Sequence, residues 1–187
     1  MADPNCKMCG LCETRTSVVQ GKGNLKSKLM LLGEAPGADE DLLGEPFVGR
    51  CGDLLTKMLS DLDIHRDSLY ITNTVKCRPV EGKKNRPPKK EEIQSCKGWL
   101  WDEIQSITPK VIITFGKVAT SLLLKISKHK LKLGDVVGKI QNVDYMDTII
   151  VPCYHPSYLM QTGKGKMQDS IDAIKLAKEV SDGRTIF

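Results

Sequence analysis

Four short apolar segments restrict the fold of this chain more than any other feature of its sequence. They are KLMLLG (28–33), LYITNTV (69–75), KVIITFG (110–116) and DTIIVPCYH (147–155), and each is rich in aliphatic and β-branched residues. Because apolar residues run almost continuously through them instead of alternating with polar ones, we expect strands that are covered on both faces, as in a parallel sheet.

Helical patterns separate these segments. Helices are expected over 52–62, 89–107, 117–126 and 170–180, where apolar residues recur at helical spacing. The alternation of strand and helix predicts an α/β fold, a three-layer α/β/α sandwich around a central, mainly parallel four-stranded sheet.

The length suits a single domain, which we expect to cover residues 1–187. Two stretches depart from the alternating pattern. Residues 131–148 contain two glycines and alternating residues, which favours a small hairpin, and residues 181–187 have the character of a tail.

The ends of three predicted strands carry the candidate functional residues. GEAPGADED follows the first strand, NTVKCRP ends and follows the second, and HPS follows the fourth. Ligands of open parallel sheets bind beyond the carboxyl ends of strands, so we expect a site there. The acidic first loop argues against a phosphate cradle, because carboxylates repel phosphate and no P-loop lysine is present.

The seven cysteines include CKMCGLC, residues 6–12, with no fourth cysteine nearby. No apolar run approaches the roughly 20 residues needed to span a membrane and no secretory signal is evident, so we expect an intracellular, cytoplasmic protein. Reduced, clustered cysteines more often bind metal than form disulfides. The motif leaves three readings: a metal module, a cluster with distant ligands, or three ordinary cysteines.

A basic run occupies residues 76–90, with seven Lys or Arg against one acid. Such a run is typical of a solvated loop, but it is also typical of a surface that binds phosphates.

The stretches GEAPGADEDLLGEPFVG (33–49), TNTVKCRP (72–79) and YHPSYL (154–159) occur in this order. With the cysteines, the chain resembles the bacterial and archaeal family 4 uracil-DNA glycosylases, which carry an iron-sulfur cluster. The resemblance implies a monofunctional enzyme that flips uracil out of single- or double-stranded DNA and hydrolyses its N-glycosidic bond. Free uracil and an abasic site result, and base excision repair begins. It also implies a monomer with no membrane partner.

The resemblance assigns roles to residues around the flipped base. Phe47 stacks on uracil, Asn73 pairs with its O4 and N3–H edge, and His155 donates a hydrogen bond to O2 as negative charge develops there. Each residue also has a purely structural reading: Phe47 as a cap on the core, Asn73 as a strand-end residue that bonds the backbone, and His155 as a structural histidine.

The glycine-rich loop supplies the rest of the expected pocket, from Glu34, Ala35 and Pro36. Ala35 stands where family 1 glycosylases have an aspartate, so their usual general base is missing. We expect Glu40 to lie near the uracil C5 edge, where it excludes the methyl group of thymine and positions water. The alternative is that the acids of this loop are merely solvated.

The resemblance selects four cysteine ligands for a [4Fe-4S] cluster and treats Cys12 as a bystander. Spacing alone does not separate such a cluster from zinc. DNA contacts are expected from the basic run and from the HPS segment, where Leu159 is either an apolar wedge in the duplex or an ordinary core residue. The family often has an Arg after this segment, but here Met160 and Gln161 follow, which leaves Lys164 and Lys166 as substitutes. The expected ligands are Cys6, Cys9, Cys77 and Cys96, and the expected DNA contacts are Arg78, Lys83, Lys84, Arg86, Ser157 and Leu159.

Two other functions are compatible with parts of the sequence. An inactive DNA-binding protein with a glycosylase fold would account for Ala35 and for the altered residues 160 and 161. A zinc-stabilised protein-interaction module would account for the cysteines but leaves Asn73 and His155 unexplained.

Overall fold

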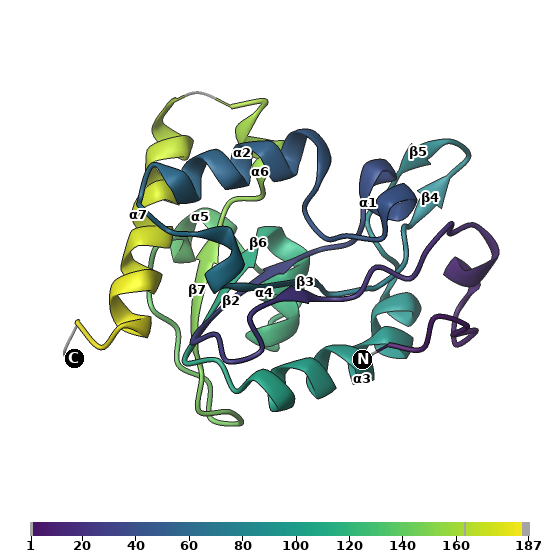
Figure 1. Ribbon diagram of the computed structural model, residues 1–187, viewed down its shortest axis with the longest axis horizontal. Helices are drawn as coiled ribbons and strands as arrows, with labels where there is room; N and C mark the ends of the chain where they lie inside the picture. Colours follow the sequence, from purple (N-terminus) through teal and green to yellow (C-terminus); the bar gives the residue numbers. More distant parts are fainter. Residues whose placement is uncertain (1, 163, 185–187) are drawn as a thin grey trace.

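A five-stranded sheet forms the centre of the computed structural model, which describes residues 2–162 and 164–184 (Figure 1). The strand order is β1-β3-β2-β6-β7, and the last four of these strands are parallel. The predicted strands are therefore confirmed, as β2 (Leu29–Gly33), β3 (Tyr70–Asn73), β6 (Val111–Phe115) and β7 (Ile149–Cys153). The fifth, β1 (Lys22–Gly23), pairs antiparallel with β3 and is exposed, so no apolar pattern marks it.

Alternate residues of the strands pack into two separate cores, which explains why apolar residues run almost continuously through the strands. Leu31 and Ile113 face one core, and their chain neighbours Met30 and Ile112 face the other. Helices cover both faces, as the predicted three-layer fold requires (Figure 1). The first core is covered by α2 (Gly49–Ser60), α6 (Pro156–Leu159) and α7 (Lys164–Ser181), and the second by α3 (Lys90–Ile107) and α4 (Gly116–Leu123).

The predicted hairpin over 131–148 is wrong. This stretch begins with a short helix, α5 (Leu133–Val136), and contributes only an isolated bridge from Gln141 to Ile150 of β7. Leu131 and Leu133 are both buried, so their alternation reflects anchoring to the core and not strand pairing. Gly138, at φ 68°, adopts the left-handed conformation that turns the chain toward β7.

Two elements lie in segments where only loops were expected. The acidic loop contains α1 (Ala38–Leu43), which ends at Gly44 in the left-handed conformation, φ 72°. The basic run forms a hairpin of β4 (Val80–Glu81) and β5 (Lys84–Asn85). Short 3-10 helices, η1 (Gly10–Glu13) and η2 (Arg66–Ser68), complete the elements.

The carboxyl-terminal helix is longer than expected. It begins at Lys164, six residues before the predicted start at 170, and ends at Ser181. Of the predicted tail, residues 185–187 lie outside the described part of the chain. No helix in the described ranges is long and apolar enough to cross a membrane.

Candidate active site

A cavity of about 840 Å³ lies at the carboxyl edge of the parallel strands, where a site was predicted. Its walls come from segments that follow β2, β3, β6 and β7, and from α1, α5 and the hairpin. Nine of the residues predicted from the sequence line it: Glu34, Ala35, Pro36, Glu40, Phe47, Asn73, Arg86, His155 and Ser157.

Phe47 lies between α1 and α2 in an unusual backbone conformation. Its φ of 52° is in the left-handed region, which a bulky side chain rarely occupies. Arg66 stabilises this conformation by donating to the carbonyl oxygens of Pro46 and Phe47, both at 2.8 Å. The ring packs 5.6 Å from Phe115 and 6.1 Å from His155, measured between centroids, so Phe47 both caps the core and lines the cavity.

Asn73 ends β3 and is paired in register with Gly33 of β2. It is buried, and the described residues offer its side-chain amide no hydrogen-bond partner. A Cβ atom on Gly33 would lie 2.2 Å from Asn73 Oδ1 and 2.7 Å from the Phe47 ring. Gly33 therefore lets an amide and an aromatic ring approach the same side of the cavity, a role that the sequence reasoning missed and that a glycine at a strand end signals.

His155 is fixed by the helix that follows it. As the N-cap of α6, it accepts a hydrogen bond at Nδ1 from the Ser157 backbone N–H at 3.2 Å, and the Ser157 hydroxyl lies 2.8 Å from the same atom. Because Nδ1 acts as an acceptor, the neutral ring carries its proton on Nε2. Burial lowers the pKa of His155 to about 4, so the ring is neutral at physiological pH.

The acidic residues of the glycine-rich loop have different roles: some line the cavity, and one holds the fold together. Glu40 lines the cavity from α1, and its Oε2 accepts from the Gly37 N–H at 3.0 Å. Burial raises the pKa of Glu40 and likewise that of Glu34. Asp41 is also buried, but it accepts hydrogen bonds from the backbone of Thr16 and Ser17, so it ties the amino-terminal segment to α1 and is not a solvated acid.

The basic hairpin stands beside α1 (Figure 1), and its cations have different surroundings. Arg86 forms a two-pronged ion pair with Glu92, at 2.8 and 2.6 Å, and holds the pKa of that carboxyl below its usual range. Arg78 crosses the hairpin to Asn85 at 2.7 Å. Lys83 and Lys84 are exposed and make no ion pair with any described residue.

Leu159 does not lie where a wedge must lie. It is only 3% exposed and belongs to the core beneath α6 and α7, so the ordinary structural reading holds and the wedge assignment is wrong. The helical turn of α6 directs Leu159 inward and leaves Tyr158 and Met160 exposed on either side of it. Ser157, predicted as a DNA contact, lines the cavity next to His155.

The four predicted cysteine ligands line one smaller cavity, between the amino-terminal segment and α3, and Cys12 is absent from its lining. Among residues 2–162 and 164–184, no three candidate ligands converge closely enough to hold one metal ion, so these thiols surround the cavity instead of meeting at a point. Burial raises the pKa of Cys9, Cys96 and Cys77, the last to about 11.

The cysteine cavity has the donor chemistry of an iron-sulfur site. Arg15 donates to Cys77 Sγ at 3.5 Å, and the Lys76 N–H donates to Cys96 Sγ at 3.3 Å. Trp99 also lines this cavity, and its Nε1, which is shielded from solvent, has no hydrogen-bond partner among the described residues. A group that carries positive iron and acceptor sulfur would stabilise the buried thiolates and give donors such as this a partner.

A buried ion pair lies beside the segment that connects the two cavities. Lys76 Nζ lies 2.6 Å from Glu103 Oε2 and also donates to the Asn73 carbonyl at 2.9 Å. Lys76 directly precedes Cys77, so the same short segment positions Asn73 on the larger cavity and Cys77 on the smaller one. Removing one partner of such a pair leaves an unpaired buried charge, which is strongly destabilising.

Comparison with known families decides the relationship that the motifs suggested. Residues 20–175 match the model of the family described as the uracil DNA glycosylase superfamily. The chain belongs to this superfamily. A type-4 uracil-DNA glycosylase of Saccharolobus solfataricus is 42% identical over 81% of this chain and 71% of its own length. A type-4 enzyme of Thermotoga maritima is 39% identical over 87% and 82%. A type-5 uracil-DNA glycosylase of Pyrobaculum aerophilum is more distant, at 28% identity over 83% and 73%.

The motifs typical of the superfamily lie at the larger cavity. The three motif segments that suggested the family are the segments that meet there, from β2, β3 and β7. The other end of the Asn73–Cys77 segment lines the cysteine cavity, and Cys6 and Cys9 fall before the matched residues 20–175.

Proposed function

We propose that this protein is a type-4 uracil-DNA glycosylase that removes uracil from DNA and thereby starts base excision repair. The observation that carries the proposal is the meeting of Phe47, Asn73 and His155 in one cavity at the carboxyl edge of the sheet. An aromatic ring, an unpartnered amide and a neutral imidazole donor are what recognition and release of a flipped pyrimidine require. The type-4 relatives support the same activity.

In the proposed mechanism, uracil leaves the stack and enters the larger cavity, with its ring against Phe47. Flipping is required because the glycosidic bond is inaccessible inside a duplex, and it costs a few kcal/mol that the cavity contacts offset. Asn73 offers a donor to uracil O4 and an acceptor to N3–H. Its amide has no competing partner among the described residues, so it meets the base without first breaking another bond.

His155 acts on the leaving group. As the N-glycosidic bond breaks, the sugar becomes oxocarbenium-like and negative charge develops at uracil O2. The Nε2–H of a neutral ring donates to that oxygen, and Ser157 holds the ring in the required tautomer through Nδ1. We place His155 as the electrophilic residue that stabilises the departing uracil anion.

Glu40 is the residue we assign to water and to thymine exclusion. Its Oε2 accepts from the Gly37 N–H, and the carboxylate lines the cavity, where a water molecule can reach it. Burial raises the pKa of Glu40, and a carboxylate closer to neutrality accepts a proton from water more readily. Glu34, Ala35 and Pro36 complete the wall behind the base.

We propose that Cys6, Cys9, Cys77 and Cys96 hold a [4Fe-4S] cluster. Bound there, the cluster would supply cross-linking and no redox step, because hydrolysis of an N-glycosidic bond transfers no electrons. Its ligands come from the amino-terminal segment, from the segment before the basic hairpin and from α3. These cysteines would thus hold the hairpin residues Arg78, Lys83, Lys84 and Arg86 in place beside the larger cavity.

The activity is tested with two matched oligonucleotides that differ only by uracil or thymine at one position. We expect an abasic site, revealed as strand cleavage after alkali, in the uracil strand alone. Strand binding without any abasic product, in the presence of an active control enzyme, would favour the inactive DNA-binding protein that Ala35 left open.

Replacing Asn73 by Asp should lower uracil excision and raise the ratio of cytosine to uracil excision. A carboxylate only accepts, so it loses the donor to uracil O4 and gains an acceptor for the cytosine amino group. Leaving a buried polar group unmatched costs about 1–3 kcal/mol, or roughly 5- to 150-fold in rate. Steady-state excision on uracil-containing and cytosine-containing strands measures the ratio. An unchanged ratio in a folded variant would contradict the assignment.

A further inference from the structure

A second basic segment lies outside the motifs that suggested the family. The lysine loop, residues 125–132 with the sequence KISKHKLK, carries four lysines and a histidine with no acid. It connects α4 to α5. Residues 125–130 and Lys132 are exposed, while the buried Leu131 and Leu133 attach the end of the loop to the core.

The lysines of this loop are mostly uncompensated. Lys125 lies over the Tyr145 ring, 3.5 Å from its centroid, and is held there by a cation–π interaction. Lys128, Lys130 and Lys132 have no carboxylate within ion-pair distance among the described residues. Exposed cations without internal partners are available to an anionic ligand.

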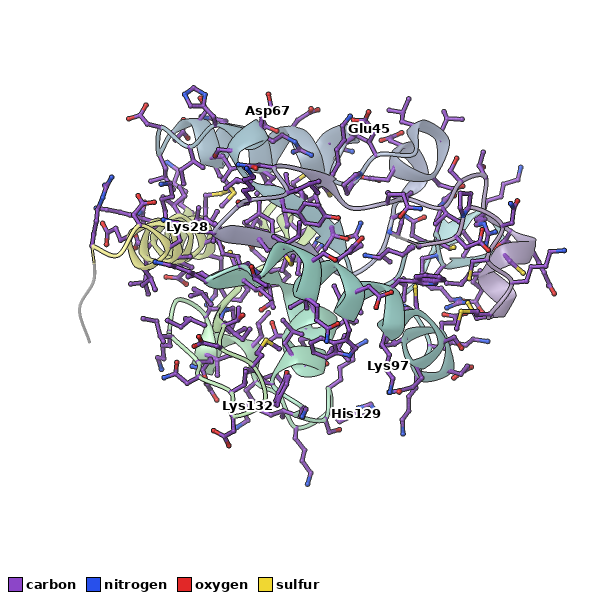
Figure 2. The ribbon with its side chains drawn as sticks, turned by 60° about the horizontal axis from the view of Figure 1, so that its bottom comes forward. Lys28, Glu45, Asp67, Lys97, His129 and Lys132 are labelled. Carbon is purple, nitrogen blue, oxygen red and sulfur yellow. The ribbon has the colours of Figure 1, made fainter. Side chains whose placement is uncertain are left out.

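The lysine loop borders the larger cavity. Lys132, Leu133 and Gly134 line it, and the positive charge of Lys128 acts on the Glu34 carboxyl in the cavity wall, against the dominant effect of burial. Figure 2 shows His129 and Lys132 at one extremity of the molecule, apart from Lys28. The loop therefore brings Lys132 to the rim of the cavity, and the charge of Lys128 reaches a carboxyl group in the cavity wall.

The lysine loop and the basic hairpin approach the cavity from different sides. The hairpin follows β3, whereas the lysine loop and α5 precede β7, and β2 and β6 lie between these two strands. Asn85 and Arg86 line the cavity from the hairpin, and Lys132 lines it from the loop. Cations consequently border two sides of a cavity whose proposed occupant, uracil, is neutral.

We propose that the lysine loop binds the DNA phosphate backbone on the side of the flipped nucleotide opposite the basic hairpin. This inference rests on the proposed function. A neutral base needs no cations, but the phosphates on both sides of it do, and a strand whose nucleotide enters the cavity must pass both rims. An anionic membrane would also attract lysines, but it gives no reason for them to border the cavity.

The test is a salt titration of DNA binding by the full chain, purified under nitrogen. The probe is a fluorescent duplex with an uncleavable abasic-site analogue, and anisotropy gives Kd between about 50 and 200 mM NaCl. In K128Q/K130Q/K132Q we expect the slope of log Kd against log salt to fall by about 2 to 3, at roughly 0.9 for each lost phosphate contact, and Kd at the low salt to rise at least about tenfold.

Two further variants make this result decisive. K26Q/K28Q/K110Q removes the same charge from exposed lysines at the amino ends of β2 and β6, on the opposite edge of the sheet, and should leave most of the slope intact. K128R/K130R/K132R keeps the charge and should restore the slope. An unchanged slope in the glutamine variant of the loop, or equal losses in both glutamine variants, would overturn the proposal. It would also be overturned if the glutamine variant of the loop lost binding to anionic vesicles but kept its binding to DNA.

The two proposals fail separately. Anisotropy requires no excision, so the salt slope reports on the lysine loop even for a protein that leaves uracil in place. Absence of excision by the unsubstituted chain would refute the glycosylase activity, while an intact slope difference would still assign DNA binding to the loop.

Discussion

Replacing His155 by Ala should lower the turnover of uracil excision by about 10²–10³-fold, the usual cost of removing one donor to a developing oxyanion. The Nε2–H is the donor, because Nδ1 is occupied by the Ser157 backbone N–H. Single-turnover excision of uracil from an oligonucleotide measures the chemical step directly. Near-normal excision by His155→Ala would show that another group carries the charge on O2.

The structural role of His155 requires a matched variant. Since the ring caps α6, His155→Ala should also cost about 1 kcal/mol of stability through loss of the cap. Asn is a favoured capping residue, so His155→Asn should recover stability without recovering turnover. His65→Ala, at an exposed histidine, serves as the control for both measurements. Recovery of turnover together with the cap would mean that His155 acts only by holding α6.

The pKa of His155 fixes the sign of the pH dependence. Burial places this pKa near 4, below the ordinary histidine value of about 6.5, so the neutral donor persists as pH falls from 8 to about 5. Excision should therefore show no histidine titration near pH 6.5. Stability depends on pH differently. As pH falls below about 6.5, His155 of the unfolded chain binds a proton, whereas the native ring stays neutral until about pH 4. The free energy of unfolding should therefore decrease as pH falls from about 6.5 to about 4.

The predictable parts of the fold are those whose burial requires a recognisable pattern of apolar residues in the sequence. The four parallel strands are covered on both faces, so most of their positions are apolar and the segments are easily recognised in the sequence. The exposed strand β1 leaves no such pattern. The alternation of Leu131 and Leu133 was misleading, because two buried anchors at a spacing of two also suit the entry to a short helix such as α5.

The same division holds for the site. The positions of Asn73 and His155 at strand ends predicted that they lie near one site, because parallel strands bring their carboxyl ends to one edge of the sheet. Tertiary partners were not predictable: Arg86 pairs with Glu92 of α3, Asp41 bonds the amino-terminal backbone, and Leu159 turns into the core. Each outcome depends on a segment distant in sequence or on the exact direction of a helical turn, which residue type alone does not specify.

The cysteine cavity leads to the prediction with the largest effect on stability. Cys9→Ala should abolish iron binding and lower the melting temperature, whereas Cys12→Ala should leave iron content and melting temperature intact. The two residues are three apart in the same motif, but Cys9 lines the cavity with Cys6, Cys77 and Cys96, and Cys12 does not.

The stability loss follows from the position of the proposed ligands. They connect the amino-terminal segment, the segment around Cys77 and α3. Lys76, which precedes Cys77, donates a hydrogen bond to the carbonyl oxygen of Asn73. Binding energy at a metal site that joins distant segments is also folding energy, so its loss should loosen the Asn73 segment and reduce excision as well. Iron and acid-labile sulfide per chain after anaerobic purification, with thermal denaturation, test this. Iron loss in Cys12→Ala with retention in Cys9→Ala would exclude the assigned ligand set, and zinc without iron in the unsubstituted protein would exclude the cluster.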